Sequence, residues 1–294
     1  MDLSSFLQYL ISGLTVGSTY GLTALGFTII FNATRVINFA QGEFVMMGGM
    51  LSVFFMSALG AGLMPAIVLA ITCTTIVGVC MERLTIRPVQ GAHVINIIII
   101  TIGVSIFIRG MVMLFLGKDT YVLPPFFGQE NIIDFFGASI MPQSLWILCI
   151  TMLVLAGLRE FFNKTIFGKA MLACSFEQKA AHLVGISVDR MVMFSFAISA
   201  LVGSIGGVIL TPITMTSYDV GIILGLKGFA ACILGGLGNP FGAAAGGLMI
   251  GVLEAFGAGY ISSAFKDAFA FIILLAILFV KPSGIFGKAE IERV

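Results

Sequence analysis

Long apolar runs separated by short polar segments follow one another along almost the whole chain. Because about 20 apolar residues cross a bilayer as a helix, the pattern predicts spanning helices near residues 6–31, 42–58, 62–80, 94–116, 144–160, 191–211, 221–237, 242–259 and 268–281. Glycine and polar residues interrupt the runs in 21–58 and 221–259, where two short half-helices compete with a pair of full spans. The predicted fold is an all-α polytopic membrane protein with eight or nine transmembrane helices, some of them broken or re-entrant.

Composition supports this class. Hydrophobic residues make up 59% of the 294 and charged residues 10%, whereas a soluble domain has about 25% charged residues. We therefore treat residues 1–294 as a single transmembrane domain. The two interrupted regions occupy comparable places in the halves 1–143 and 144–294, which suggests a faint internal pseudo-repeat, although chance produces such patterns too. No Lys or Arg precedes the first apolar run, so we expect that run to be retained as a helix.

The distribution of Lys and Arg predicts the orientation of the chain. Basic residues concentrate in 81–93, in 159–190 and in the tail: Arg83, Arg87, Arg159, Lys164, Lys169, Lys179, Arg190, Lys281, Lys288 and Arg293. The 117–143 loop has only Lys118 against Asp119, Glu130 and Asp134. Because positively charged loops stay on the cytoplasmic side, nine crossings place the N-terminus outside and the C-terminus inside.

Glycines recur at four-residue spacing, which places them on one face of a helix: Gly13, Gly17 and Gly21, then Gly203 and Gly207, then Gly238, Gly242 and Gly246. We interpret these faces as sites of tight helix packing. The alternative is that some of them line a substrate path.

Several kinds of chemistry lack residues to support them. Each Gly-Lys pair, at Gly117, Gly168 and Gly287, lacks the rest of a phosphate-binding loop, so the chain is not expected to hydrolyse ATP by itself. The two histidines have no metal-ligand spacing, and the five cysteines form no C-x-x-C pair. The glycine-rich ILGGLGNPFG has no Lys and is interpreted as a hairpin turn. We therefore expect neither an enzyme nor a cofactor.

Charges within or beside apolar runs are candidates for function, because a charge at membrane depth costs several kcal/mol unless it is paired or hydrated. They are Glu43, Arg109, Lys227, Glu254, Lys266 and Asp267. For Arg109, Lys266 and Asp267 we favour placement at the membrane interface. Glu43 is harder to dismiss, since it begins an apolar run.

The segment RVINFAQGEFVMMGG, residues 35–49, combines polar residues with methionine and glycine. Arg35 and Asn38 are interpreted as a cytoplasmic turn, in which Asn satisfies backbone groups freed by a broken helix. Gln41 and Glu43 are expected to cap the next helix. The following methionines and glycines are expected to form a closely packed wall beside a pathway.

The 159–190 segment contains the pattern A-A-x-x-x-G at Ala180, Ala181 and Gly185. Apolar residues alternate with polar ones from Glu177 onward, which predicts a short amphipathic helix on the inner face of the membrane. If this helix has a function, we expect it to be a docking surface for a cytoplasmic partner. The alternative is that the segment is only a solvated connector between helices.

Three stretches resemble a known family. YGLTALGFTIIFNATRVINFAQGEFVMMGG, GFAACILGGLGNPFGAAAGGLMIGVLEA and FAFIILLAILFVKPSGIFGK are similar to the permease subunits of bacterial ABC importers for branched-chain amino acids, and the length resembles the shorter of the two permease types. The resemblance implies a multi-pass protein of the inner membrane that carries Leu, Ile or Val. It implies three kinds of partner besides lipid: a second homologous permease, two cytoplasmic ATPases and a periplasmic amino-acid-binding protein, with no nucleic acid.

The resemblance also implies a coupling segment of the E-A-A-x-x-x-G type, here Glu177, Lys179, Ala180, Ala181 and Gly185. Lys179 stands where the family has Glu, and no Leu-Pro follows. Candidate pathway or gating residues are Asn38, Gln41, Glu43, Gly48, Gly236 and Asn239. The alternatives are an ABC permease for urea, amides or other amino acids, an ion-coupled secondary transporter, and an assembly subunit without a path of its own.

Overall fold

The computed structural model describes residues 3–60, 62–89, 91–126, 132–135, 137–281 and 283–287. Its α-helices are α1 (Leu3–Thr34), α2 (Gln41–Ala58), α3 (Leu63–Met81), α4 (Val94–Leu116), α5 (Pro142–Lys164), α6 (Ile166–Phe176), α7 (Gln178–Leu183), α8 (Val188–Thr214), α9 (Val220–Gly235), α10 (Pro240–Tyr260) and α11 (Lys266–Val280). Short helical turns η1 (Glu82–Ile86), η2 (Arg87–Val89) and η3 (Ser263–Phe265) extend them. A small hairpin pairs β1 (Ile133–Phe135) with β2 (Ala138–Ile140), with Ile133 opposite Ile140.

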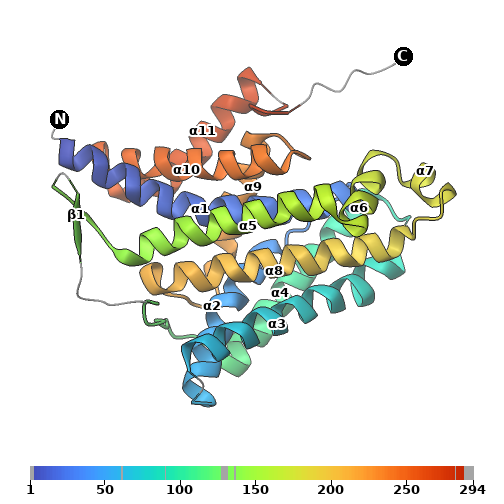
Figure 1. Ribbon diagram of the computed structural model, residues 1–294, viewed down its shortest axis with the longest axis horizontal. Helices are drawn as coiled ribbons and strands as arrows, with labels where there is room; N and C mark the ends of the chain where they lie inside the picture. Colours follow the sequence, from blue (N-terminus) through green and yellow to red (C-terminus); the bar gives the residue numbers. More distant parts are fainter. Residues whose placement is uncertain are drawn as a thin grey trace.

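Each predicted spanning segment is a helix, and the all-α polytopic fold is confirmed (Figure 1). Within the described ranges, seven helices are long and apolar enough to cross a membrane: α1, α3 with its continuation to Val89, α4, α5, α8, α10, and α11 with η3. Neither α2 nor α9 belongs to this set. α9 has only 16 residues, and α2 carries Gln41 and Glu43 in its first turn. The count of eight or nine crossings, like the pseudo-repeat of two halves, stays a prediction.

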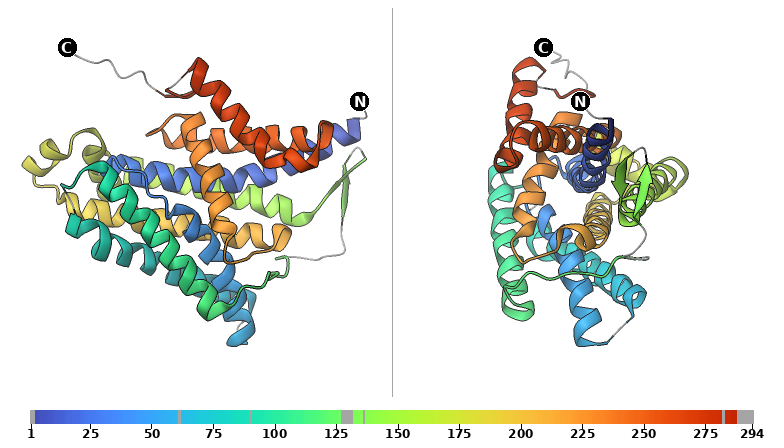
Figure 2. Two further views of the ribbon diagram at one scale, coloured as in Figure 1. Left: turned by 180° about the vertical axis from the view of Figure 1, so that it is seen from behind. Right: turned by 90° about the vertical axis from the view of Figure 1, so that its left-hand side faces the viewer.

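Helix α1 lies at the centre of the molecule, beside α10 and α8 (Figures 1 and 2). Glycines make this contact close. A Cβ atom on Gly251 of α10 would lie 2.3 Å from the Cα atom of Gly17. Gly242 and Gly246 meet the backbone of α9 in the same way, and Gly207 meets α2. The interpretation of these glycine faces as packing surfaces is confirmed at these positions. It is wrong for Gly238, which lies in the turn before α10 with a φ of 90° and not on a helix face.

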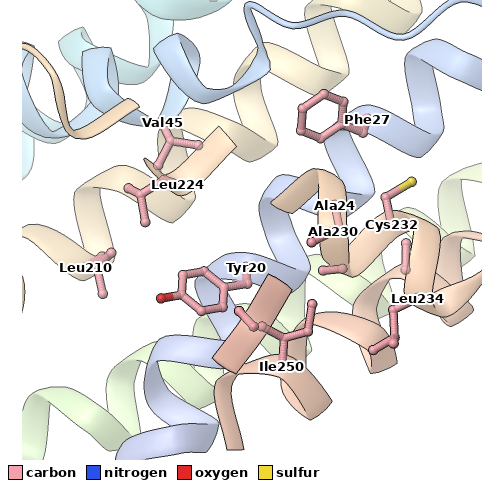
Figure 3. Close-up of a cluster of buried hydrophobic side chains, with 13 residues drawn as sticks. Tyr20, Ala24, Phe27, Val45, Leu210, Leu224, Ala230, Cys232, Leu234 and Ile250 are labelled. Atoms are coloured by element: carbon pink, nitrogen blue, oxygen red, sulfur yellow. The ribbon is translucent and has the colours of Figure 1, made fainter. Parts of the chain in front are cut away.

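The largest buried apolar cluster among the described residues joins α1, α2, α8, α9, α10 and α11. Figure 3 shows its side chains, with the hydroxyl of Tyr20 directed away from Ile250. Small residues such as Ala24, Ala230 and Cys232 are completely buried there. Because the outer surfaces of a membrane protein are as apolar as its interior, close fit holds these helices together more than the hydrophobic effect does.

Most of the segments between helices lie toward one of two ends of the molecule (Figure 1). At one end, Arg87 pairs with Asp189 at 3.2 Å, and Asn239 donates to the carbonyl of Phe286. We call this the basic end, because it holds Arg35, Arg83, Arg87, Arg159, Lys164, Lys169, Lys179, Arg190 and Lys281. At the opposite end, Gln8 bonds Ser139, and Tyr121 pairs with Thr216.

The three basic segments predicted to share one side of the membrane do lie at one end of the molecule. The start of α1 and the described parts of the 117–143 segment lie at the other (Figure 1). Of the charges used in that prediction, Glu130, Lys288 and Arg293 lie outside the described residues.

Candidate functional site

The chain between α1 and α2 is a break that turns back into the protein. Arg35 has a φ of 59°, in the left-handed region, and its guanidinium donates to the carbonyl of Ser175 at the basic end. From there residues 36–40 run inward, and the amide of Phe39 donates to the hydroxyl of Thr101, the eighth residue of α4. Helix α2 therefore begins inside the molecule instead of at its surface.

Irregular backbone at membrane depth is tolerated only where protein covers it and its polar groups find partners. Asn38 is buried, and its Oδ1 accepts from the amide of Ala40 at 3.1 Å. The carbonyl of Asn38 accepts from the amide of Gln41. The expectation that Asn38 satisfies backbone groups at a helix break is confirmed.

The expectation that Gln41 and Glu43 cap α2 is wrong. Ala40 occupies the N-cap position, and α2 has no side-chain cap bond. The side chain of Gln41 is instead buried against α8, where it accepts from the hydroxyl of Ser199 at 2.5 Å. Capping requires a side chain to fold back along its own helix, whereas this one has a partner across the interface.

Glu43 faces α4. The hydroxyl of Ser105 donates to Oε1 of Glu43 at 2.8 Å, and Nη2 of Arg109 lies 3.4 Å from the same oxygen. Placement of Arg109 at the membrane interface, favoured from the sequence, stays a prediction, whereas its contact with Glu43 was not predicted. Its side chain is 24% exposed and its charge is directed to a carboxylate whose side chain is 2% exposed. Sequence spacing carried no sign of this pair, because the two residues are far apart along the chain.

The other predicted pathway residues divide between two places. Gly48 lies on α2, where a Cβ atom would stand 2.2 Å from the carbonyl oxygen of Ser204, so it serves close packing against α8. Gly236 and Asn239 lie in the turn between α9 and α10 at the basic end. Asn239 caps α10 by accepting from the amide of Gly242 at 3.1 Å. ILGGLGNPFG is thus a hairpin turn, as predicted, and the structure does not bring its residues near Glu43.

The methionines after Glu43 are core residues. Met46, Met47 and Met50 are buried and pack against Ile108 and Val112 of α4. Their role as a pathway wall stays a prediction.

The predicted coupling segment forms α7 and the turn after it. Glu177 is the N-cap of α7, and its side chain accepts from the amide of Lys179 at 3.2 Å. Ala181 is buried beside Met171, Cys174 and Met191, while Lys179 and Ala180 are exposed. Gly185 ends the segment with a φ of 87°, a conformation that glycine adopts without strain. The helix is short, at six residues, and Ala181 is its one buried residue, so its amphipathic character stays a prediction.

Two hydrogen bonds tie the coupling segment to the α1–α2 break. Gln178 donates to the carbonyl of Ala33 at 2.6 Å, and Arg35 donates to the carbonyl of Ser175 in the last turn of α6. We call these two bonds the clamp. Helix α7 lies at one extremity of the molecule, at the basic end (Figure 1). Three apolar side chains in and beside it are largely exposed: Phe176 at 82%, Leu183 at 86% and Val184 at 76%.

A second buried ionic cluster was not predicted as a pair. Lys227 of α9 lies 2.9 Å from Glu254 of α10, and Nζ of Lys227 also donates to the hydroxyl of Tyr20 at 3.0 Å. Lys227 and Glu254 are 3% and 1% exposed. Asp267 and Lys266 reach the cluster from the start of α11, with side chains 60% and 49% exposed. The sequence indicated this pair only by placing a lysine in one apolar helix and a glutamate in the next.

The fold is that of a multi-pass helical membrane protein. The central helix α1 is separated from α2 by a break that turns back into the protein, and buried polar groups lie beside this break. The family described as "Branched-chain amino acid transport system / permease component" matches residues 9–278. The chain therefore belongs to this family of transport permease components, and the resemblance noted in its sequence is confirmed.

Relatives cover nearly the full chain. The "High-affinity branched-chain amino acid transport system permease protein LivH" of Escherichia coli (strain K12) is 35% identical over 98% of both chains. The protein of the same description named BraD, from Pseudomonas aeruginosa, is 33% identical over 100% of this chain and 99% of its own. A partial match, 30% identical over 54% of this chain and 49% of its own, is the "L-arabinose transport system permease protein AraH" of Escherichia coli (strain K12).

Proposed function

We propose that this chain is the membrane-spanning permease subunit of an ABC importer that carries Leu, Ile or Val inward across the inner membrane. The observation that supports it most is full-length similarity to permease proteins of high-affinity branched-chain amino acid transport systems. Residues 1–294 form its transmembrane domain, and the basic end faces the cytoplasm, in keeping with the positive-inside rule. The partners are a second homologous permease, two cytoplasmic ATPases and a periplasmic amino-acid-binding protein.

In this proposal α7 and its flanking turns dock on an ATPase. The exposed apolar side chains of Phe176, Leu183 and Val184 supply a contact surface that is unfavourable in water. ATP-driven movement of the ATPases displaces α7, and the clamp transmits that movement to the α1–α2 break. Helix α2 then shifts relative to α4 and α9, which changes access to the buried polar groups between them.

The test is uptake of labelled leucine into proteoliposomes that hold the permease pair and both ATPases, with binding protein outside. Import that requires ATP and binding protein, and that persists with a protonophore, is expected. Uptake that stops with the protonophore but ignores ATP would instead support ion-coupled transport. Competition by urea, an amide or L-arabinose with leucine uptake would redefine the substrate.

The docking surface makes a separate prediction. Leu183→Glu places a charge in the proposed contact, and we expect the amount of ATPase that co-purifies with the permease to fall at least tenfold. The matched control is Ile132→Glu, an apolar residue 60% exposed at the opposite end. Unchanged co-purification of Leu183→Glu, measured at equal permease yield, would contradict docking at α7.

The clamp between α7 and the α1–α2 break makes a second prediction. Gln178→Leu keeps the size of the side chain but removes the bond to Ala33, so we expect leucine imported per ATP hydrolysed to fall several-fold while ATPase binding is retained. Gln8→Leu, which removes bonds to Ser139 at the opposite end, should leave this ratio unchanged. An equal effect of both substitutions would refute a specific role of the clamp.

A further inference from the structure

A cavity of about 150 Å³ lies between the start of α2, the middle of α4 and the first half of α9. Its polar lining is Glu43, Ser105 and Arg109. Its apolar lining comprises Phe27, Phe39, Ile102, Ile222, Leu226 and Phe229. One acid, one base and a hydroxyl thus meet a set of aromatic and branched aliphatic side chains.

The polar groups of this cavity are incompletely bonded. Glu43 is 1% exposed, yet its Oε2 has no hydrogen-bond partner among the described residues, and the same holds for Nε of Arg109. A buried polar atom without a partner costs about 1–3 kcal/mol, more when charged. The ion pair is also long, 3.4 Å, where close charge-assisted bonds measure about 2.7–2.9 Å. These unmet bonds indicate a ligand with both a cationic and an anionic group.

We propose that this cavity binds the zwitterion of the transported amino acid, a proposal that rests on the proposed function. Glu43 Oε2 accepts from the ammonium group of the ligand, and the unpaired Nε–H of Arg109 donates to its carboxylate. The three phenylalanines and Ile102 surround its branched side chain. The ligand's two charges lie side by side, as do the two protein charges, so both orphaned atoms obtain partners without separating the pair.

The position of the cavity suits a transport route. Ser105 is the twelfth of the 23 residues of α4, so the cavity is near the middle of that helix. Ile222 and Leu226 are 39% and 42% exposed at its rim. Helices α4 and α9 lie on the same face of the molecule (Figure 2). An amino acid would therefore reach the cavity along this face and not through the centre of the helix bundle.

A purely structural ion pair is the competing explanation, and paired substitutions separate the two. Glu43→Gln and Arg109→Gln should each raise the KM for leucine uptake or lower its rate at least tenfold. A structural pair predicts that the double variant regains uptake, because no buried charge is left unpaired. Zwitterion binding predicts that the double variant is at least as impaired as either single variant. Recovery in the double variant would overturn the proposal.

A binding measurement tests the same cavity without relying on transport. In a cysteine-free background, Ile222→Cys places a thiol at the rim, and its labelling rate with a charged methanethiosulfonate reagent is measured on the full complex. We expect millimolar leucine to slow labelling several-fold, and 4-methylpentanoate or 3-methylbutylamine, which each lack one charged group, to protect less. Protection should disappear in Glu43→Gln. Labelling that leucine does not slow, in a complex that still imports leucine, would exclude this cavity while leaving the proposed function intact. A wild-type complex that does not import leucine would instead refute the proposed function.

Discussion

Replacing Lys227 by Met is expected to lower the free energy of unfolding by about 3–5 kcal/mol, the cost of leaving a buried charge unpaired. Lys227 contacts Glu254 at 2.9 Å and Asp267 at 2.6 Å, and its own side chain is 3% exposed. Without it, Glu254 keeps only a 3.4 Å contact with Lys266 and the hydroxyl of Tyr20. Thermal unfolding of the purified permease in detergent measures the loss.

Two further variants give this prediction its controls. The double variant Lys227→Met, Glu254→Leu removes both charges, so most of the lost stability should return. Lys164→Met removes an ion pair to Glu160 whose side chains are 74% and 58% exposed, and it should change stability by less than about 1 kcal/mol. If Lys227→Met unfolds at the wild-type temperature, the cluster contributes nothing to stability.

Gly251→Leu is expected to abolish accumulation of folded protein. The first atom of the new side chain would lie 2.3 Å from the Cα atom and 2.4 Å from the amide nitrogen of Gly17. Overpacking costs about 1–3 kcal/mol where side chains can adjust, and the backbone of α1 cannot adjust without moving the whole helix. Gly103→Leu on α4 is the matched control, because no atom lies within 4 Å of its added Cβ.

The measurement is the amount of monodisperse permease extracted from membranes, with Gly251→Ala as an intermediate step that should lower it less. Equal yields of Gly251→Leu and Gly103→Leu would show that α1 and α10 separate easily. That result would contradict close packing as the force that holds this pair together.

The sequence determined the fold class and the positions of α1–α5 and α8–α11 because burial in lipid demands a long apolar run, and such runs are local. It also predicted correctly that the basic segments share one end, that Asn38 supports a broken helix, and that the glycines on helix faces pack. The last two follow from residues near one another in the chain, and the first follows from the preference of positively charged segments for one side of the membrane. The family was recognisable for the same reason, since its signature is a continuous stretch.

The tertiary structure alone decided which polar groups meet. Glu43 was expected to cap its own helix, and its contact with Arg109 was not predicted. The two share a cavity with Ser105 because α2 begins inside the protein opposite the middle of α4. Lys227 and Glu254 were recognised only as separate charges. A charge buried in an apolar helix requires a partner, but its own sequence neighbours do not reveal which other helix supplies one. The crossing of helices fixes that choice, and in this chain closely packed glycines set the crossings.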